Sequence, residues 1–166
     1  MILGIAGGNG LEHIKSGDFE RVYGVDVNRA YLAECEQRYP SLSEALELIC
    51  ADLLGDNLML PHSDLLIADL LIEYIGYVYF QRAVQIVKPE YISCVIQINT
   101  DNFFVSNSPY LHKFDRLDEV HCQISSEDLM RVMCGIGYVQ EDQTETDLPN
   151  GKKLIKTDFS FDRRTL

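Results

Sequence analysis

At 166 residues the chain is long enough to bury one sizeable core, and we expect a single domain spanning residues 1–166. The net charge of −12 and the pI of about 4.6 give a surface that repels phosphate backbones, so a nucleic-acid partner is not favoured. No apolar run approaches membrane-spanning length and no basic leader precedes one, which indicates a cytoplasmic protein without a membrane partner.

The cysteines and histidines argue against a metal or disulfide framework. The five cysteines are odd in number and form no C-x-x-C pair, and the four histidines show no ligand spacing. We therefore expect a reducing compartment and no zinc site. The cysteines are Cys35, Cys50, Cys94, Cys122 and Cys134.

The chain opens with a short apolar run that leads directly into glycines. Gly4, Gly7, Gly8 and Gly10 fall within seven residues, and a short helix is predicted over 11–15. Glycine permits positive φ and lets a ligand or another backbone come close. A strand, a glycine turn and a helix start are typical of the nucleotide-binding corner of a doubly wound α/β domain.

A second strand is predicted over 21–26 and ends in Asp26. An acidic residue at this tip can accept hydrogen bonds from both hydroxyls of a ribose, so the pattern predicts an adenosine-containing cofactor. We expect Asp26 to contribute little to stability without ligand, because a strand-tip carboxylate near solvent makes few folding contacts. Asn28 is a good cap for a helix over 29–39, which ends before Pro40.

Strands and helices continue to alternate. Strands are predicted over 46–50, 65–68 and 91–98, with a helix over 73–87 before the last of them. Nearly continuous apolar strands separated by helices indicate a parallel sheet covered on both faces. The helix should bury an apolar stripe formed by Ile75, Val78, Tyr79, Ala83, Ile86 and Val87.

The pattern changes after the fifth strand. Residues 99–124 form a long polar and aromatic connection, and we predict that Asn102 to Phe114 folds over the site as a lid, alone or against a second subunit in a homodimer. A helix capped near Ser125 should run to Cys134. Strands over 138–145 and 154–161 should then form a hairpin across Asn150-Gly151.

This order of elements resembles the class I methyltransferases that use S-adenosylmethionine (SAM). The resemblance implies an α/β three-layer sandwich, doubly wound, with a mostly parallel seven-stranded sheet and a C-terminal antiparallel hairpin. The run from Leu3 to Gly10 resembles the family's first motif, and Asp26-Val27 its ribose-binding strand. Ala51-Asp52-Leu53 resembles the motif that binds the adenine amino group, and Asp69 lies where the fourth-strand motif faces the methyl group. The residues that the resemblance implies for SAM binding are Gly4, Ala6, Gly7, Gly8, Gly10, Asp26, Val27, Ala51, Asp52, Leu53 and Asp69.

The sequence departs from the family pattern in its first motif. Gly4 stands where an acidic residue is usual, and Ala6 replaces the first family glycine. Glu12 is a candidate substitute for the missing carboxylate. No helices precede the first strand, so the roof of the site is expected from 99–124 or from another subunit.

Methyl transfer depends mainly on positioning and on exclusion of water, which leaves no catalytic triad to read from the sequence. Asp69, Glu73 and Tyr74, which follow the fourth strand, are the candidates for substrate contact or for a general base. The alternative is structural: Asp69 caps the next helix and Tyr74 packs in the core. The acidic composition favours a small, neutral or cationic acceptor.

Two other functions stay open. The spacing of Gly4, Gly8 and Gly10 fits nicotinamide-dependent reductases, but none of the nine tyrosines has a lysine four residues on, as their Tyr-x-x-x-Lys pair requires. A SAM-binding module without catalysis, acting as a sensor or partner subunit, is consistent with the departures at Gly4 and Ala6.

Overall fold

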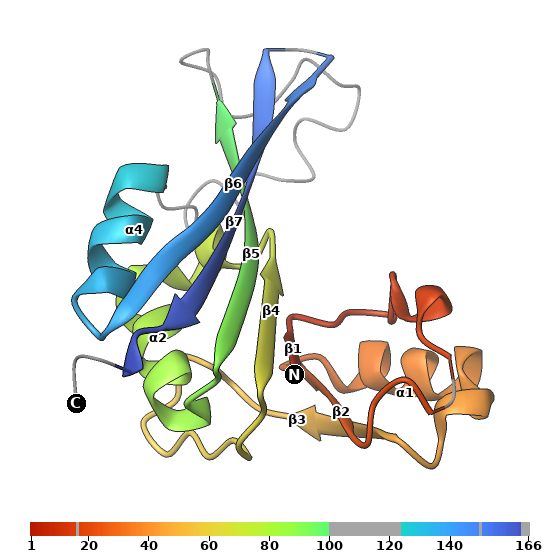
Figure 1. Ribbon diagram of the computed structural model, residues 1–166. Coiled ribbons are helices and arrows are strands. Elements are labelled where there is room, and N and C mark those ends of the chain that lie inside the picture. The colour runs from red at the N-terminus through yellow and green to blue at the C-terminus, as the bar shows by residue number, and fades with distance from the viewer. Residues whose placement is uncertain (16, 100–123, 150, 164–166) are drawn as a thin grey trace.

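The computed structural model describes residues 1–15, 17–99, 124–149 and 151–163, and in these ranges seven strands form one sheet in the order β3-β2-β1-β4-β5-β7-β6 (Figure 1). Strands β1 to β5 pair in parallel, whereas β7 runs antiparallel to both β5 and β6. The predicted sheet, mostly parallel with a C-terminal antiparallel hairpin, is confirmed. The strands are β1 (Ile2–Leu3), β2 (Val22–Asp26), β3 (Leu46–Cys50), β4 (Leu65–Asp69), β5 (Tyr91–Asn99), β6 (Tyr138–Leu148) and β7 (Lys152–Phe161).

Helices cover both faces of this sheet. On one face, α1 (Arg29–Arg38) and the short 3-10 helices η1 (Leu11–His13) and η2 (Pro40–Leu42) bury a small apolar cluster against β1, β2 and β3. On the other face, α2 (Ile72–Val87) and α4 (Ser126–Cys134) pack together over a larger cluster. Because successive strand residues point to opposite faces, the sheet packs against a helical layer on each side. The fold is therefore the doubly wound three-layer sandwich that was predicted.

The helix α2 differs from its predicted form because it is interrupted at Gly76. This glycine has φ 72 and ψ 168, which breaks the helix between its first turn and the longer segment that follows. The apolar stripe is therefore set by the segment after the break, in which Phe80 and Val84 are fully buried. Val78, predicted in the stripe, is 75% exposed, and Tyr79 is also exposed, so the stripe prediction is wrong at these two positions.

The hairpin is longer than predicted. Its strands extend to Leu148 and begin again at Lys152, and a bulge between Gln140 and Asp142 shifts the register on β6. The added pairs place Leu148 opposite Lys152, next to the predicted Asn-Gly turn. Among the described residues, no helix combines the length and the apolar character needed to cross a bilayer.

Candidate functional site

The loops that follow four parallel strands meet at one edge of the sheet. Leu3 lies opposite Val25 and Ala68, and Asp26 lies opposite Cys50, so the carboxyl ends of β1 to β4 are adjacent. The structure thus brings the residues predicted to bind a cofactor to the same edge. They are Gly4, Ala6, Gly7, Gly8 and Gly10 after β1, Asp26 and Val27 at β2, Ala51, Asp52 and Leu53 after β3, and Asp69 at β4.

The glycine loop packs tightly against α1. A Cβ at Gly8 would lie 2.7 Å from the Cys35 sulfur and 2.8 Å from a ring carbon of Tyr39, and the backbone there has φ 82. Only glycine can adopt this positive φ without strain and also leave room for Cys35 and Tyr39 without displacing the helix. Ala6 also has a positive φ of 49, a strained conformation for a residue with a side chain.

Asp26 ties this loop to the tip of β2. Its Oδ2 accepts a hydrogen bond from the Ala6 backbone N–H at 2.9 Å, and its Oδ1 accepts one from the Asn28 N–H at 2.8 Å. The expectation that this carboxylate makes few folding contacts is therefore wrong. The reason is that a loop with several positive φ values leaves backbone donors that need a local acceptor.

Side chains from η1 and the end of α1 hold the rest of the loop. Glu12 accepts hydrogen bonds from the Gly10 N–H at 2.8 Å and from the Tyr39 hydroxyl at 2.9 Å. Hydrogen bonds from its own backbone and from Tyr39 lower the pKa of Glu12. Arg38 donates to the Gly7 carbonyl at 2.8 Å. Glu12, proposed from sequence as a substitute acid for the cofactor, is thus already engaged inside the loop.

The loop after β3 is braced from α2. The Arg82 guanidinium donates to the carbonyls of Leu53 at 2.6 Å and Gly55 at 2.8 Å, and it lies over the ring of Tyr79. Asp52 accepts from the Leu54 N–H at 2.9 Å, which closes the turn. Sequence reasoning missed Arg82, as it missed Arg38 and Tyr39, because such long-range bonds leave no periodic signal.

Beyond β4 the chain turns sharply toward α2. Leu70 has φ 54, and its N–H donates to the Val95 carbonyl on β5 at 2.8 Å. Asp69 is exposed at the strand tip, yet the surrounding protein shields its carboxyl from part of the solvent, which raises its pKa. The charge of Lys156, on β7, acts in the opposite direction. Asp69 makes no capping hydrogen bond to α2, whose first residue is Ile72.

Glu73 and Tyr74 lie in different surroundings. Glu73 is 2% exposed, and its Oε1 accepts a hydrogen bond from the Gln97 N–H at 2.6 Å. The last β4–β5 pair is Asp69 with Val95, so Gln97 lies beyond the β4–β5 ladder, and Glu73 supplies the acceptor for its N–H. Burial raises the pKa of Glu73. Tyr74 is 38% exposed, which makes it accessible to a substrate, unlike a core tyrosine.

The predicted lid, Asn102 to Phe114, lies outside the described residues. The same holds for Asn150 in the hairpin turn. The candidate site in the described part of the chain consists of the four loops at the carboxyl edge, the last of which is the turn that leads into α2.

Known proteins match this chain in structure and not in sequence. No protein-family model and no curated protein matches the sequence. The methyltransferase domain of a bacterial Hen1 matches with a TM-score of 0.73 and 16% identity, over 97% of this chain and 88% of that one. A SAM-dependent methyltransferase from Mesorhizobium loti matches with a TM-score of 0.71 and 16% identity, over 96% and 88%.

A third solved structure carries a ligand. The magnesium protoporphyrin IX methyltransferase from Synechocystis PCC 6803, with bound S-adenosylhomocysteine, matches with a TM-score of 0.67 and 10% identity, over 96% of this chain and 72% of that one. At these identities the likeness concerns the fold. The fold of this chain is that of the class I SAM-dependent methyltransferases, as the order of its elements and motifs predicted.

Proposed function

We propose that this chain is a SAM-dependent methyltransferase that acts on a small acceptor molecule. The observation that carries the proposal is the glycine loop held to the tip of β2 by Asp26, with the loops after β3 and β4 at the same edge of the sheet. The shared fold supports it, since the solved structures with this architecture that were found include several SAM-dependent methyltransferases.

The residues present suit the groups that SAM would offer. Each Asp26 oxygen keeps a lone pair beyond its backbone bond and can accept from a ribose hydroxyl. Asp52, by the resemblance, accepts from the adenine amino group. In the glycine loop, the backbone N–H groups of Gly7 and Asn9 make no hydrogen bond within the described chain, and they suit the cofactor's carboxylate. When bound, SAM supplies an electrophilic methyl group for transfer to a nucleophile.

Asp69 and Tyr74 are the chain's own groups near the place where, by the resemblance, the methyl group of SAM would lie. A carboxyl with a raised pKa is well suited to accept a proton or a hydrogen bond from an acceptor near neutral pH. The exposed Tyr74 offers a hydroxyl and an aromatic face for orientation. Glu73 is less suited to direct contact, because one of its oxygens is bonded to Gln97 and the residue is buried.

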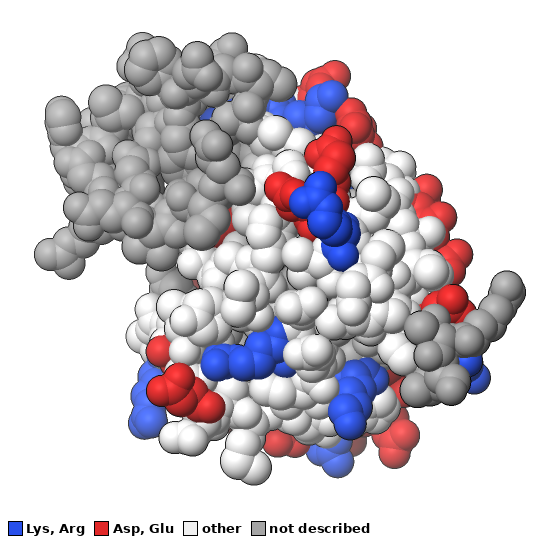
Figure 2. All heavy atoms as spheres, turned by 90° about the vertical axis from the view of Figure 1, so that its left-hand side faces the viewer, with Lys and Arg blue, Asp and Glu red and all other residues white. Residues whose placement is uncertain are grey.

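The charge distribution favours a small acceptor. The chain carries 26 acidic against 14 basic residues. On the face that carries α2 and α4, charges of both signs are scattered, and the described residues form no continuous basic patch (Figure 2). A polyanionic acceptor would gain little from this surface, whereas a neutral or cationic molecule would not be repelled.

The test of the proposed function is ligand-dependent thermal stability. S-adenosylhomocysteine at 100 times its Kd should stabilise the folded chain by about 2.7 kcal/mol, and the melting temperature should rise accordingly. NADH serves as the matched control, because it also carries adenosine and would occupy the same edge in a reductase. A larger shift with NADH, and none with S-adenosylhomocysteine, would contradict the proposal.

A SAM-binding module without catalysis is the second candidate. It is favoured by Gly4, which offers no carboxylate where the family has one, and by Glu12, whose carboxylate is already bonded to Gly10 and Tyr39. Binding of S-adenosylhomocysteine combined with no methyl transfer from SAM to a panel of amines, thiols, phenols and carboxylates would select this candidate.

A further inference from the structure

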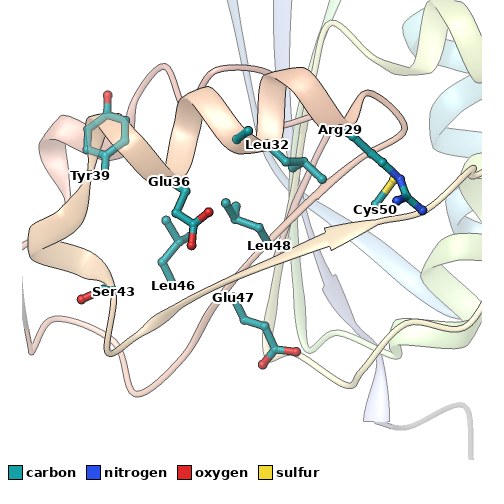
Figure 3. A pocket seen from close by; sticks show the side chains of 10 residues that line it. Arg29, Leu32, Glu36, Tyr39, Ser43, Leu46, Glu47, Leu48 and Cys50 are labelled. Atoms are coloured by element: carbon teal, nitrogen blue, oxygen red, sulfur yellow. The ribbon is translucent and has the colours of Figure 1, made fainter.

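A groove of about 670 Å³ runs along the outer edge of β3, beneath α1. Leu46 and Leu48 point from the strand toward the helix, and Leu32 points down from the helix between them and Cys50 (Figure 3). Glu47 points away on the other side of the strand. The groove is therefore apolar along its middle and lies outside the loops of the candidate site.

Among the strands that the structure describes, the one that forms the floor of this groove has a free edge. β3 is the last strand in the sheet order on this side. The Val22 N–H donates to the Ala45 carbonyl and the Ala51 N–H donates to the Asp26 carbonyl, so alternate peptide groups from Ala45 to Ala51 face β2. The peptide groups of Leu46, Leu48 and Cys50 consequently face away from the sheet, as on any unpaired edge.

Opposite charges stand at the two ends of the groove. Arg29 lies beside Cys50 at one end, and Glu36 lies toward the Leu46 end, two helical turns along the same side of α1 (Figure 3). Both residues are exposed, and neither side chain makes an ion pair or a hydrogen bond within the described part of the chain. Leu32 lies between them. The pattern along the groove is thus positive, apolar, negative.

We propose that this groove is the interface of a two-fold symmetric dimer, in which β3 pairs antiparallel with β3 of a second copy about Leu48. A two-fold axis at Leu48 places Leu46 opposite the partner's Cys50 and joins the two sheets edge to edge. The same axis exchanges the ends of the groove, so Arg29 faces the partner's Glu36 and Glu36 faces the partner's Arg29. Such self-complementarity is what an isologous interface requires.

The charge pattern is the reason for choosing a second copy over another occupant. A peptide from a different protein would need only the free edge and the apolar floor. A second copy also satisfies both unpaired charges at once, and each copy inserts its own Leu48 at the centre. The dimer would leave the carboxyl edge of β1 and β4 uncovered, so this inference does not depend on the proposed function.

The test is a charge swap followed by sedimentation equilibrium at about 0.15 M salt, where charges more than roughly 8 Å apart are screened. Arg29→Glu creates two Glu–Glu contacts and Glu36→Arg creates two Arg–Arg contacts, so each single variant should weaken the dimer at least about tenfold. The double variant Arg29→Glu/Glu36→Arg restores opposite charges across the axis and should return the dimer Kd to within about threefold of the wild type.

Both substitutions are at exposed positions. In the double variant the acidic side chain is near the start of α1 and the basic one is near its end, which suits the helix dipole, so α1 should remain folded. Glu20→Arg, an exposed reversal before β2, is the matched control and should leave the dimer unchanged. The proposal is overturned if the wild-type chain stays monomeric at roughly 100 μM. That is also the result expected if the groove binds a segment of another protein. A dimer that is insensitive to the single reversals, or one that the double variant does not restore, also overturns the proposal.

Discussion

The carboxylate of Asp26 performs a folding task at the position where a cofactor's ribose is expected. Its two oxygens accept from the backbone of Ala6 and of Asn28, so it fixes the glycine loop and the entry to α1 together. A substitution here should therefore affect both the stability of the free protein and its affinity for ligand. Sequence reasoning recognised the position but not the two backbone bonds, which depend on the loop's conformation.

We predict that Asp26→Ala lowers the free energy of unfolding by about 1–3 kcal/mol, because two charge-assisted backbone hydrogen bonds are lost at a partly exposed site. Urea denaturation without ligand measures this effect. S-adenosylhomocysteine affinity should also fall at least about tenfold by calorimetry. Asp56→Ala, in the exposed loop after β3, is the control. Unchanged stability would show that the two bonds contribute nothing, and unchanged affinity would remove Asp26 from the site.

Glu73 gives the protein a pH dependence that can be isolated. Burial raises its pKa from the ordinary value of 4.5, so the folded chain holds this proton more tightly than the unfolded chain. The stability that depends on this proton is present below about pH 4.5 and is lost as the pH rises through the raised pKa. We predict that Glu73→Gln, which keeps an acceptor for Gln97, gains stability relative to the wild type as the pH rises above about 4.5.

Denaturation of the wild type and of Glu73→Gln at a series of pH values provides the measurement. The variant Glu127→Gln, which makes the same substitution at an exposed position, is the control. A constant difference between wild type and Glu73→Gln would mean that Glu73 stays ionised throughout. If Glu73→Gln still transfers the methyl group, the role of Glu73 is to position β5. If the variant loses the acidic limb of the plot of activity against pH, the role of Glu73 is proton transfer.

At the scale of the element, α2 shows where local sequence and tertiary packing disagree. Its apolar residues suggest one continuous helix, but Gly76 adopts φ 72 and ψ 168, a region that is essentially restricted to glycine. The break sets a new register, which buries Phe80 and Val84 and exposes Val78. It also leaves a short first turn, residues 72–75, that carries Glu73 and Tyr74 at the candidate site.

We predict that Gly76→Ala destabilises the protein by about 1–3 kcal/mol through backbone strain. Gly135→Ala is the matched control, because Gly135 at the end of α4 has φ −62 and its Cβ would meet only carbonyl oxygens at 3.4 Å. That substitution should be neutral or stabilising by up to about 1 kcal/mol. Thermal denaturation compares the two. Equal effects would mean that the break at Gly76 imposes no strain.

Elements were predictable to the extent that their signals are local. The bounds of β3 match the prediction, because Leu46–Cys50 is a short segment in which every residue except Glu47 is apolar. Asn28 caps α1 through its side chain, as its residue type predicts. The extra pairs of the hairpin and the break at Gly76 were not predictable. The continuous polar run on β6 carries no apolar signal, and a single glycine is compatible with an intact helix.

At the scale of the whole molecule, the candidate site was predictable because parallel strands must end at a common edge. The order of motifs along the chain then determines which loops meet there. The residues that hold those loops, Arg38, Tyr39 and Arg82, were not predictable, because each reaches a loop about thirty residues away in sequence. The architecture thus follows from local patterns, and the rigidity of the site follows from contacts between distant segments.

The pairing of β7 with β5 has a consequence for how the protein is made. β5 has nine residues, and its antiparallel partner is β7, the last described strand along the chain, with Tyr91 opposite Ser160. While the chain emerges from a ribosome, β5 can already pair with β4, but its other side must wait for about sixty further residues. During that interval it presents a long edge with apolar Ile92, Cys94 and Ile96, the kind of surface on which nascent chains aggregate. Slow docking of the hairpin, and not assembly of the parallel half, should therefore limit the yield of native protein during synthesis.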